Sequence, residues 1–319
     1  MSLLKTRLEN KAGRNMTVAM AMGIRSGHLS AKAAIGIWKA LVRPVLEYGA
    51  EVWGEGEWKD AEIIQRKMGR RILGRRGKST DETILGELGW WTMQARRWML
   101  RLRYWRKLIS EMGPERLPRK VYNWERRSGR TNSWTKQTEE IMEQLGLAEV
   151  WKRQDTGGNK EDWEKLLNQR IQEHEQKRWE GEMKRKTKLR TYIKFKKELR
   201  QEKYLEDEDS KGRRLLARIR SGTNSLRIET GRHNHTPLER RICYMCGVEV
   251  EDELHFLMRC VAYEDIRKEC LDDIGRKQDD PEVEEIMFGN GSGKEIKEVI
   301  RFVKRANSRR TRVMKLLGR

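Results

Sequence analysis

The sequence predicts a mainly α-helical protein, and three patterns support this fold class. Across residues 92–112, large apolar side chains recur every three or four positions, which is the period of one helix face. Residues 161–207 contain no proline and a single glycine, Gly181, so nothing there requires a helix to end. Near the C-terminus, Ser292 and Glu295 have the spacing of a capping box, which predicts that a last helix starts there.

The composition narrows the class of partner. Charged residues make up 37% of the 319 residues, above the roughly 25% of an average globular protein, and hydrophobic residues make up 36%. The chain can therefore bury a core, but much of its helix surface must be solvated. The net charge of +21 indicates a polyanionic partner, and nucleic acid, either RNA or DNA, is the first candidate. No motif predicts a small-molecule substrate.

The sequence also indicates where the protein is found. No stretch approaches the ~20 apolar residues of a membrane span, and no signal-peptide pattern follows the N-terminus. All four cysteines lie between Cys243 and Cys270, which suits a reducing compartment. We therefore expect an intracellular protein, nuclear or cytoplasmic, that does not use a membrane.

The N-terminal half is expected to be a series of helices. A basic segment at 1–29 precedes a helix at 31–42, which Pro44 bends or ends. In the helix at 92–112, the tryptophans are expected to pack in a core rather than to stack on bases. The arginines that flank or oppose the apolar face of this helix are the better candidates for phosphate contact. They are Arg96, Arg97, Arg101 and Arg103.

The middle of the chain is predicted to hold one long charged helix. A polar stretch at 126–133 is a candidate linker, and a short helix follows at 134–147. The stretch 161–207 has sparse apolar residues and would extend about 70 Å as a helix. Two interpretations have equal weight: a solvated spacer, or a helix that follows nucleic acid. In the second interpretation, the candidate phosphate contacts are Lys184, Arg185, Lys186 and Lys188.

Charge is unevenly distributed along the chain. Residues 96–130 hold twelve Lys/Arg against three Glu, and residues 177–203 hold twelve against four. Residues 301–319 hold eight basic residues and no acid. Residues 249–286, in contrast, hold fourteen Asp/Glu against five basic residues. The basic segments, and not the acidic one, are therefore expected to release counterions from nucleic acid.

Four potential metal ligands lie within eighteen residues. They are spaced as Cys243-x2-Cys246-x8-His255-x4-Cys260. Three thiolates and an imidazole suit tetrahedral Zn²⁺, and four protein ligands leave no open position for a catalytic water. The sequence therefore predicts one structural zinc ion per chain. An alternative ligand set replaces His255 with Cys270. Tyr244, at the tip of the CxxC turn, is a candidate for stacking on an unpaired base, or else a residue of the small core.

The sequence around these ligands resembles a known family. Arg241-Ile-Cys-Tyr-Met-Cys-Gly247 and Glu251-Asp-Glu-Leu-His-Phe-Leu-Met-Arg-Cys260 resemble the zinc-binding segment at the C-terminal end of non-LTR (LINE-type) retrotransposon reverse transcriptases. Residues 37–53, 64–74, 86–91 and 211–222 precede it in the order found in that family. The resemblance implies a helical thumb-like and linker region that grips template–primer backbone. It also implies a zinc knuckle that engages the element's RNA or its target DNA.

The polymerase residues of that family have no counterpart in the sequence. The family's palm carries a [Phe/Tyr]-x-Asp-Asp hairpin whose carboxylates hold two Mg²⁺. Neither Asp272-Asp273, expected on a polar helix face, nor Asp279-Asp280, expected in a loop, has that context. Residues 289–294 lack the spacing and the Ser/Thr of a phosphate-binding loop. We therefore expect no enzyme activity, and we expect the chain to begin after the palm would have ended.

These patterns predict four consecutive segments. They are a basic N-terminal segment (1–29), a helical thumb-like and linker region (30–150), a long charged helix (151–209), and a zinc-knuckle module with a C-terminal basic helix (210–319). Within the last segment, helices are expected at 211–222 and 262–274.

The predicted function is non-catalytic nucleic-acid binding by the post-palm region of such a reverse transcriptase. Two alternatives stay open. One is a protein-interaction module in which the acidic zinc segment docks a partner. The other is a transposon relic without a present function.

Overall fold

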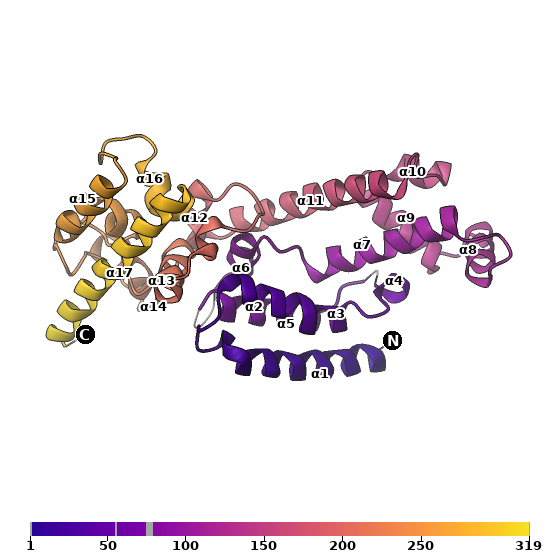
Figure 1. Ribbon diagram of the computed structural model, residues 1–319, viewed down its shortest axis with the longest axis horizontal. Coiled ribbons are helices and arrows are strands. Elements are labelled where there is room, and N and C mark those ends of the chain that lie inside the picture. Colours follow the sequence, from indigo (N-terminus) through magenta and orange to yellow (C-terminus); the bar gives the residue numbers. More distant parts are fainter. Residues whose placement is uncertain (1, 55, 75–78, 319) are drawn as a thin grey trace. The chain divides into compact units, whose positions relative to one another are not determined.

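The computed structural model describes residues 2–54, 56–74 and 79–318, and the fold in these ranges is mainly α-helical, as predicted (Figure 1). This part of the chain holds no β-strand, only the isolated bridges Leu88–Gln201 and Ile242–Val250. None of its helices is long and apolar enough to cross a membrane. Its α-helices are α1 (Ser2–Ala19), α2 (Ala31–Ile37), α3 (Arg43–Leu46), α4 (Ala50–Trp53), α5 (Lys59–Ile72), α6 (Asp81–Leu88), α7 (Met93–Arg106), α8 (Leu117–Ser128), α9 (Trp134–Gln144), α10 (Ala148–Arg153), α11 (Lys160–Lys184), α12 (Arg190–Phe195), α13 (Ser210–Arg220), α14 (Arg227–His233), α15 (Glu264–Asp273), α16 (Val283–Glu285) and α17 (Gly293–Leu316).

The chain forms two compact units, each assembled from three stretches. The first unit comprises Met1–Val18, Trp38–Arg66 and Trp91–Gly181, and the second comprises Ala19–Ile37, Lys67–Trp90 and Glu182–Arg319. The four consecutive segments predicted from the sequence do not coincide with these units. The reason is that stretches far apart in the chain share one core, which a division into consecutive segments cannot express.

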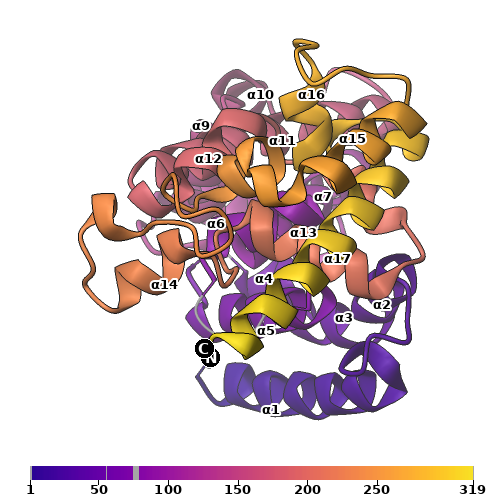
Figure 2. The ribbon, with the colours of Figure 1, turned by 90° about the vertical axis from the view of Figure 1, so that its left-hand side faces the viewer.

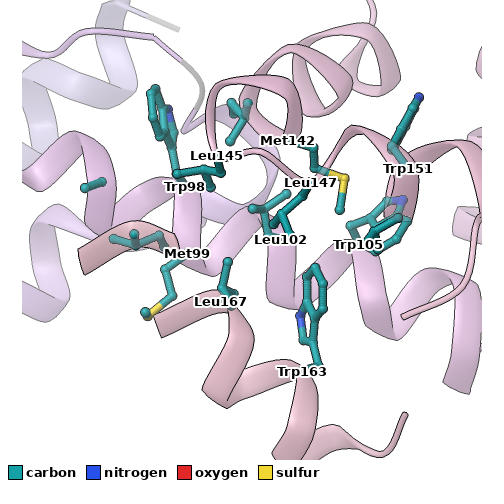
Figure 3. Packing of buried hydrophobic residues seen from close by; sticks show 14 of the residues in the cluster. Trp98, Met99, Leu102, Trp105, Met142, Leu145, Leu147, Trp151, Trp163 and Leu167 are labelled. Atoms are coloured by element: carbon teal, nitrogen blue, oxygen red, sulfur yellow. The ribbon is translucent and has the colours of Figure 1, made fainter. Parts of the chain in front are cut away.

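The core of the first unit is built around α7. Thr92 caps the helix, because its hydroxyl accepts a hydrogen bond from the backbone N of Ala95 at 3.1 Å. Trp98 and Trp105 are buried, and Trp105 Nε1 donates to the hydroxyl of Tyr122 at 3.0 Å. They pack with apolar residues of α9, α10 and α11 in one cluster (Figure 3). The predicted core role of the tryptophan stripe is confirmed.

The predicted single helix across 161–207 is wrong beyond Lys184, where α11 ends. The backbone is extended at Lys186, with φ −116° and ψ 97°. Apolar side chains of the following stretch are buried in the second unit, and the ring of Phe195 lies 4.6 Å from that of Phe288. These buried residues are Leu189, Tyr192, Phe195, Leu199, Tyr204 and Leu205. Burying them requires the chain to turn, which a straight solvated helix does not allow.

α11 itself is also more than a solvated spacer. Its few apolar residues fall on one face, where Trp163, Leu167, Ile171 and Trp179 are all fully buried. The first three belong to the core cluster of the first unit. Sparse apolar residues at four-residue spacing therefore mark a narrow buried stripe rather than a helix exposed on all sides.

The second unit packs α13 and α15 against α17, as Figures 1 and 2 show. α13 approaches α17 closely at Gly212, where a Cβ atom would lie 2.3 Å from the side chain of Ile300. The predicted capping box of α17 is confirmed, with Ser292 N donating to Glu295 Oε2 at 2.7 Å. These helices hold the segment that carries the four candidate metal ligands.

Candidate metal centre

The first two ligands lie on a tight turn. Ile242 and Val250 pair in an antiparallel bridge, so the chain between them folds back as a loop. Cys243 N donates to Glu249 O at 2.8 Å, and Gly247 N donates to Cys243 O at 2.9 Å. Gly247 has a φ of +70°, a conformation that favours glycine. This turn directs the two thiols of the CxxC motif to the same side.

The other two ligands lie on a short helical turn. His255 N donates to the Asp252 carboxylate at 2.6 Å, which caps the turn. Cys260 N donates to His255 O at 2.8 Å and closes it. His255 and Cys260 are both buried, with 1% and 0% of their surfaces exposed. The local sequence therefore places an imidazole and a third thiol opposite the CxxC turn.

The four side chains form one cluster whose dimensions suit a metal ion. The ligand atoms of Cys243, Cys246, His255 and Cys260 all lie within 4.8 Å of one another. The sulfurs of Cys243 and Cys260 are 3.9 Å apart, and Cys246 Sγ lies 3.4 Å from His255 Nε2. Zinc bond lengths of about 2.3 Å to sulfur and about 2.0 Å to nitrogen give tetrahedral edges of roughly 3.8 and 3.6 Å. The cluster could hold a metal ion, and it is the only such group of His, Cys, Asp or Glu within the described ranges.

A carboxylate orients the imidazole. His255 Nδ1 lies 3.4 Å from Glu249 Oε2, and the guanidinium of Arg259 donates to the same oxygen at 3.0 Å. A partner on Nδ1 leaves Nε2 as the nitrogen that faces the three sulfurs. Glu249 is thus a supporting residue that the spacing of the ligands alone does not reveal.

Two buried arginines of the surrounding helices support the ligand loop. Arg310, on α17, forms a two-pronged ion pair with Glu251 at 2.8 and 2.9 Å, and Glu251 Oε1 lies 3.8 Å from Cys243 Sγ. Arg267, on α15, donates to the backbone oxygens of Leu257 and Cys260 at 2.8 and 2.9 Å. No local sequence pattern distinguishes either arginine from a solvated surface residue.

The ligand groups shift one another's pKa. The hydrogen bond with Cys260 and burial raise the pKa of Cys243 to about 12, and the same hydrogen bond lowers the pKa of Cys260. Burial lowers the pKa of His255, but the neighbouring Cys243 and Cys246 outweigh it and raise that pKa to about 9. A metal ion that binds here displaces these protons, so its affinity depends on pH.

Cys270 does not join the cluster. It lies on α15, is buried, and has its pKa raised to about 12 by burial. The ligand set that the structure brings together is therefore the one with His255, not the alternative with Cys270.

The two ligand sets predict opposite results for two substitutions. Cys270→Ser should keep one equivalent of bound metal, whereas His255→Ala should weaken binding by about 100-fold or more, since even supporting residues matter by 10–100-fold. Competition with a chromophoric chelator measures both affinities. Full metal content in His255→Ala together with its loss in Cys270→Ser would overturn the assignment.

Two of the predicted phosphate contacts are wrong: Arg97 and Arg101 are completely buried. Arg101 Nε donates to the Thr138 hydroxyl at 2.9 Å, and its Nη2 donates to the Trp134 carbonyl at 3.0 Å. Arg97 donates to the Gly56 carbonyl at 3.0 Å. Side chains on this part of α7 are covered by other elements of the first unit, so phosphate cannot reach these guanidinium groups.

The other arginines predicted on α7 are paired. Arg96 lies 2.8 Å from Glu47, and Arg103 lies 2.6 Å from Glu164. Their side chains stay partly exposed, 21% for Arg96 and 39% for Arg103. A phosphate at either position would have to compete with a carboxylate.

Of the four phosphate contacts predicted between residues 184 and 188, two are exposed and two pair with buried carboxylates. Lys184 and Arg185 are exposed at the end of α11, where Arg185 forms a solvent-exposed ion pair with Glu182 at 2.8 Å. Lys186 forms an ion pair with Glu82 at 2.7 Å, and Lys188 lies 3.8 Å from Glu229. Both of these glutamates are buried, so the two lysines stabilise the second unit by neutralising buried carboxylates.

Tyr244 is half-buried beside the CxxC turn. The guanidinium carbon of Arg227 lies 4.5 Å from the centre of its ring. The ring therefore already has a cationic neighbour, and stacking on a base stays a prediction.

Part of the acidic segment 249–286 is compensated by the C-terminal helix α17. Arg309 pairs with Asp265 at 2.6 Å, and Arg305 pairs with Glu269 at 2.6 Å. Arg301 pairs with Asp273. One face of α17 thus matches one face of α15 at four-residue steps. Five of the eight basic residues in 301–319 have acidic partners, namely Arg301, Lys304, Arg305, Arg309 and Arg310.

Comparisons of the chain with protein families, with curated proteins and with solved structures found no match.

Proposed function

We propose that this protein binds nucleic acid without catalysing a reaction, and that one structural zinc ion holds its C-terminal module together. The observation that carries the proposal is the Cys₃His cluster, whose four ligand atoms all lie within 4.8 Å of one another. Three thiolates and an imidazole suit zinc better than Mg²⁺ or Ca²⁺, which prefer oxygen ligands. With four protein ligands no coordination position is left for water, so the ion is structural.

The charge of the chain supports nucleic acid as the partner. Each internal ion pair is neutral, so pairing leaves the net charge of +21, the excess of 70 Lys/Arg over 49 Asp/Glu, unchanged. Exposed cations remain on several helices, including Lys184 and Arg185 on either side of the end of α11. A polyanion can release counterions at such positions without breaking the fold.

The resemblance in the sequence makes the proposal more specific. We propose that the chain corresponds to the post-palm region of a non-LTR retrotransposon reverse transcriptase. In that role it would contribute binding to RNA or DNA, and the polymerase palm would be a separate part.

The protein-interaction alternative is less well supported. It requires the acidic face of the zinc module to be available for a partner, but Asp265, Glu269 and Asp273 are already paired with α17. The relic alternative predicts neither stoichiometric metal nor specific binding.

A salt titration tests nucleic-acid binding. The log–log slope of affinity against salt should be about −0.9 per phosphate contact on duplex DNA and about −0.7 on single strands. Replacing Lys184 and Arg185 with Gln should remove up to two phosphate contacts, and the slope should become shallower by the corresponding amount. Fluorescence anisotropy with labelled RNA and DNA at several salt concentrations measures it.

Lys32→Gln with Lys39→Gln is the matched control, since it removes the same charge from exposed positions outside the basic segments 96–130, 177–203 and 301–319. It should change the slope less. Binding that is absent at physiological salt, or insensitive to salt, would contradict the proposed function.

A further inference from the structure

α8, in the first unit, presents an apolar stripe to solvent. Leu117, Val121 and Trp124, spaced four and three residues apart, are 72%, 46% and 53% exposed. The opposite side of the helix is anchored by Tyr122, which is buried. Of the twelve tryptophans in the chain, Trp124 is the one with an exposed side chain; the others are buried or half-buried. Core packing therefore does not account for Trp124.

A guanidinium group lies on the ring of Trp124. The central carbon of Arg130 is 4.5 Å from the ring centre, which is the distance of a stacked cation–π pair. The indole is still half exposed, so a second planar group can stack on it. An aromatic ring beside a planar guanidinium is the arrangement on which unpaired bases stack.

The surroundings of Trp124 are strongly basic. Residues 116–130 contain six Lys/Arg and one acid, Glu125. Glu125 accepts a hydrogen bond from Thr135 N at 3.2 Å, so its charge is held toward α9. Within the described ranges, no carboxylate pairs with Arg126, Arg127 or Arg130. Lys120 pairs with Glu115 at 2.8 Å, but the three arginines nearest Trp124 have no such partner among the described residues, unlike the arginines of α17.

A hollow of about 470 Å³ adjoins the stacked pair. Arg126 and Arg130 line it together with Ser133, Lys136 and Lys152, and two carboxylates, Glu125 and Glu139, line it as well. Lys136 and Lys152 have carboxylate neighbours, Glu139 and Glu149, so the two arginines supply its free positive charge. The hollow offers cations and hydroxyls to an anionic group next to an aromatic ring.

We infer that this corner, the α8 platform of Trp124, Arg126, Arg127 and Arg130, binds single-stranded nucleic acid. An unpaired base stacks on Trp124, and the arginines contact the neighbouring phosphates. The inference rests on the proposed function and adds to it the form of the ligand. Single strands are favoured because bases within a duplex are already stacked and cannot reach the indole. A protein partner would have to be markedly acidic to approach the same surface.

Three substitutions at one position test the stacking. Trp124→Ala should reduce the affinity for a labelled 20-nucleotide single strand by about 5- to 150-fold, the effect of losing one base–aromatic stack. Trp124→Phe should keep most of the affinity. Trp124→Leu retains apolar surface without a π face, so it should behave like Trp124→Ala. Duplex binding should be unchanged in all three, and anisotropy measures each affinity.

Leu117→Ala is the matched control, because it removes an equally exposed apolar side chain from the same helix and should leave affinity unchanged. Circular dichroism melts verify that each variant is folded.

Unchanged single-strand binding by Trp124→Ala would refute the platform but leave the proposed function intact. Wild-type affinity in Trp124→Leu would instead indicate an apolar docking surface, and equal losses on duplex would refute the single-strand preference. Failure of the wild-type protein to bind any nucleic acid would refute the proposed function and the platform together.

Discussion

Removing zinc is expected to unfold the segment around the ligand cluster, and Cys246→Ser is expected to have the same effect. The loop from Ile242 to Leu254 forms no strand and buries no large apolar side chain, so metal binding should provide much of its folding free energy. Structural zinc sites in small modules bind with apparent free energies of about 10–16 kcal/mol at neutral pH. This is comparable with the whole stability of a typical domain, about 5–15 kcal/mol.

Two measurements check this expectation. Elemental analysis should give one zinc per chain in the wild-type protein and none in Cys246→Ser. Hydrogen exchange should show lost protection between about residues 242 and 273 after chelation. Protection around Trp105 and Trp163 should remain, since no ligand lies in the first unit.

Cys270→Ser is the matched control, because it removes a buried thiol of the same module that is outside the cluster. It should retain zinc and show at most a moderate change in stability. A Cys246→Ser variant with full zinc content and unchanged exchange protection would show that the cluster is not a metal centre.

The ligand cluster could be predicted from the sequence because its information is local. All four ligands lie within eighteen residues, and the turns that join them depend on neighbours such as Gly247 and Asp252. The tryptophan stripe of α7 was predictable for the same reason, since helical periodicity is a property of consecutive residues.

The errors concern charged residues whose partners are far away in the sequence. Arg101 is four residues from Arg97 and lies on the same side of α7, and the sequence gives no sign that a second surface covers that side. Its acceptors come from α9, more than thirty residues away. An arginine with five donors can be buried when carbonyl oxygens surround it, so hydropathy alone assigns it wrongly to the surface.

The ion pairs between α15 and α17 correspond to a regular charge spacing in the sequence. Asp265, Glu269 and Asp273 are spaced by four, and so are Arg301, Arg305 and Arg309. Matching acidic and basic faces on two predicted helices could have indicated that they pack together. The end of α11 had no such signal, because its turn depends on the burial of residues after Lys184.

The most buried ion pair of the second unit is expected to be its most sensitive polar feature. Arg220, on α13, and Glu87, on α6, are both 0% exposed, and Arg220 Nε donates to the two carboxylate oxygens at 3.1 and 3.2 Å. Arg220 Nη2 also lies 2.9 Å from Glu202, an ion pair without good hydrogen-bond alignment. Tyr204 donates its hydroxyl to Glu87. Lys196, 3% exposed, also pairs with Glu202, so two cations compensate two acidic side chains in the interior.

Acidification should weaken this cluster. Burial raises the pKa of Glu202, but Arg220 and Lys196 outweigh it and leave that pKa below its ordinary value of about 4.3. A carboxyl group whose pKa is lower in the folded state stabilises the fold above its unfolded pKa. Its contribution is therefore present at neutral pH and is lost as the pH falls below about 4.

Arg220→Met should destabilise the second unit by about 3–5 kcal/mol, because it leaves Glu87 buried without its cation and removes one of the two cations that contact Glu202. Glu87→Gln should also destabilise it, by leaving the guanidinium partly uncompensated. The double variant should lose less than the sum of the two, since the burial penalty of an unpaired charge then arises only once. Urea unfolding followed by circular dichroism provides the three free energies of unfolding.

Lys152→Met, which breaks the exposed pair with Glu149, is the control and should leave the unfolding midpoint unchanged within error. Additive effects of Arg220→Met and Glu87→Gln would show that the two side chains are not coupled, and a small effect of Arg220→Met would show that water reaches the pair.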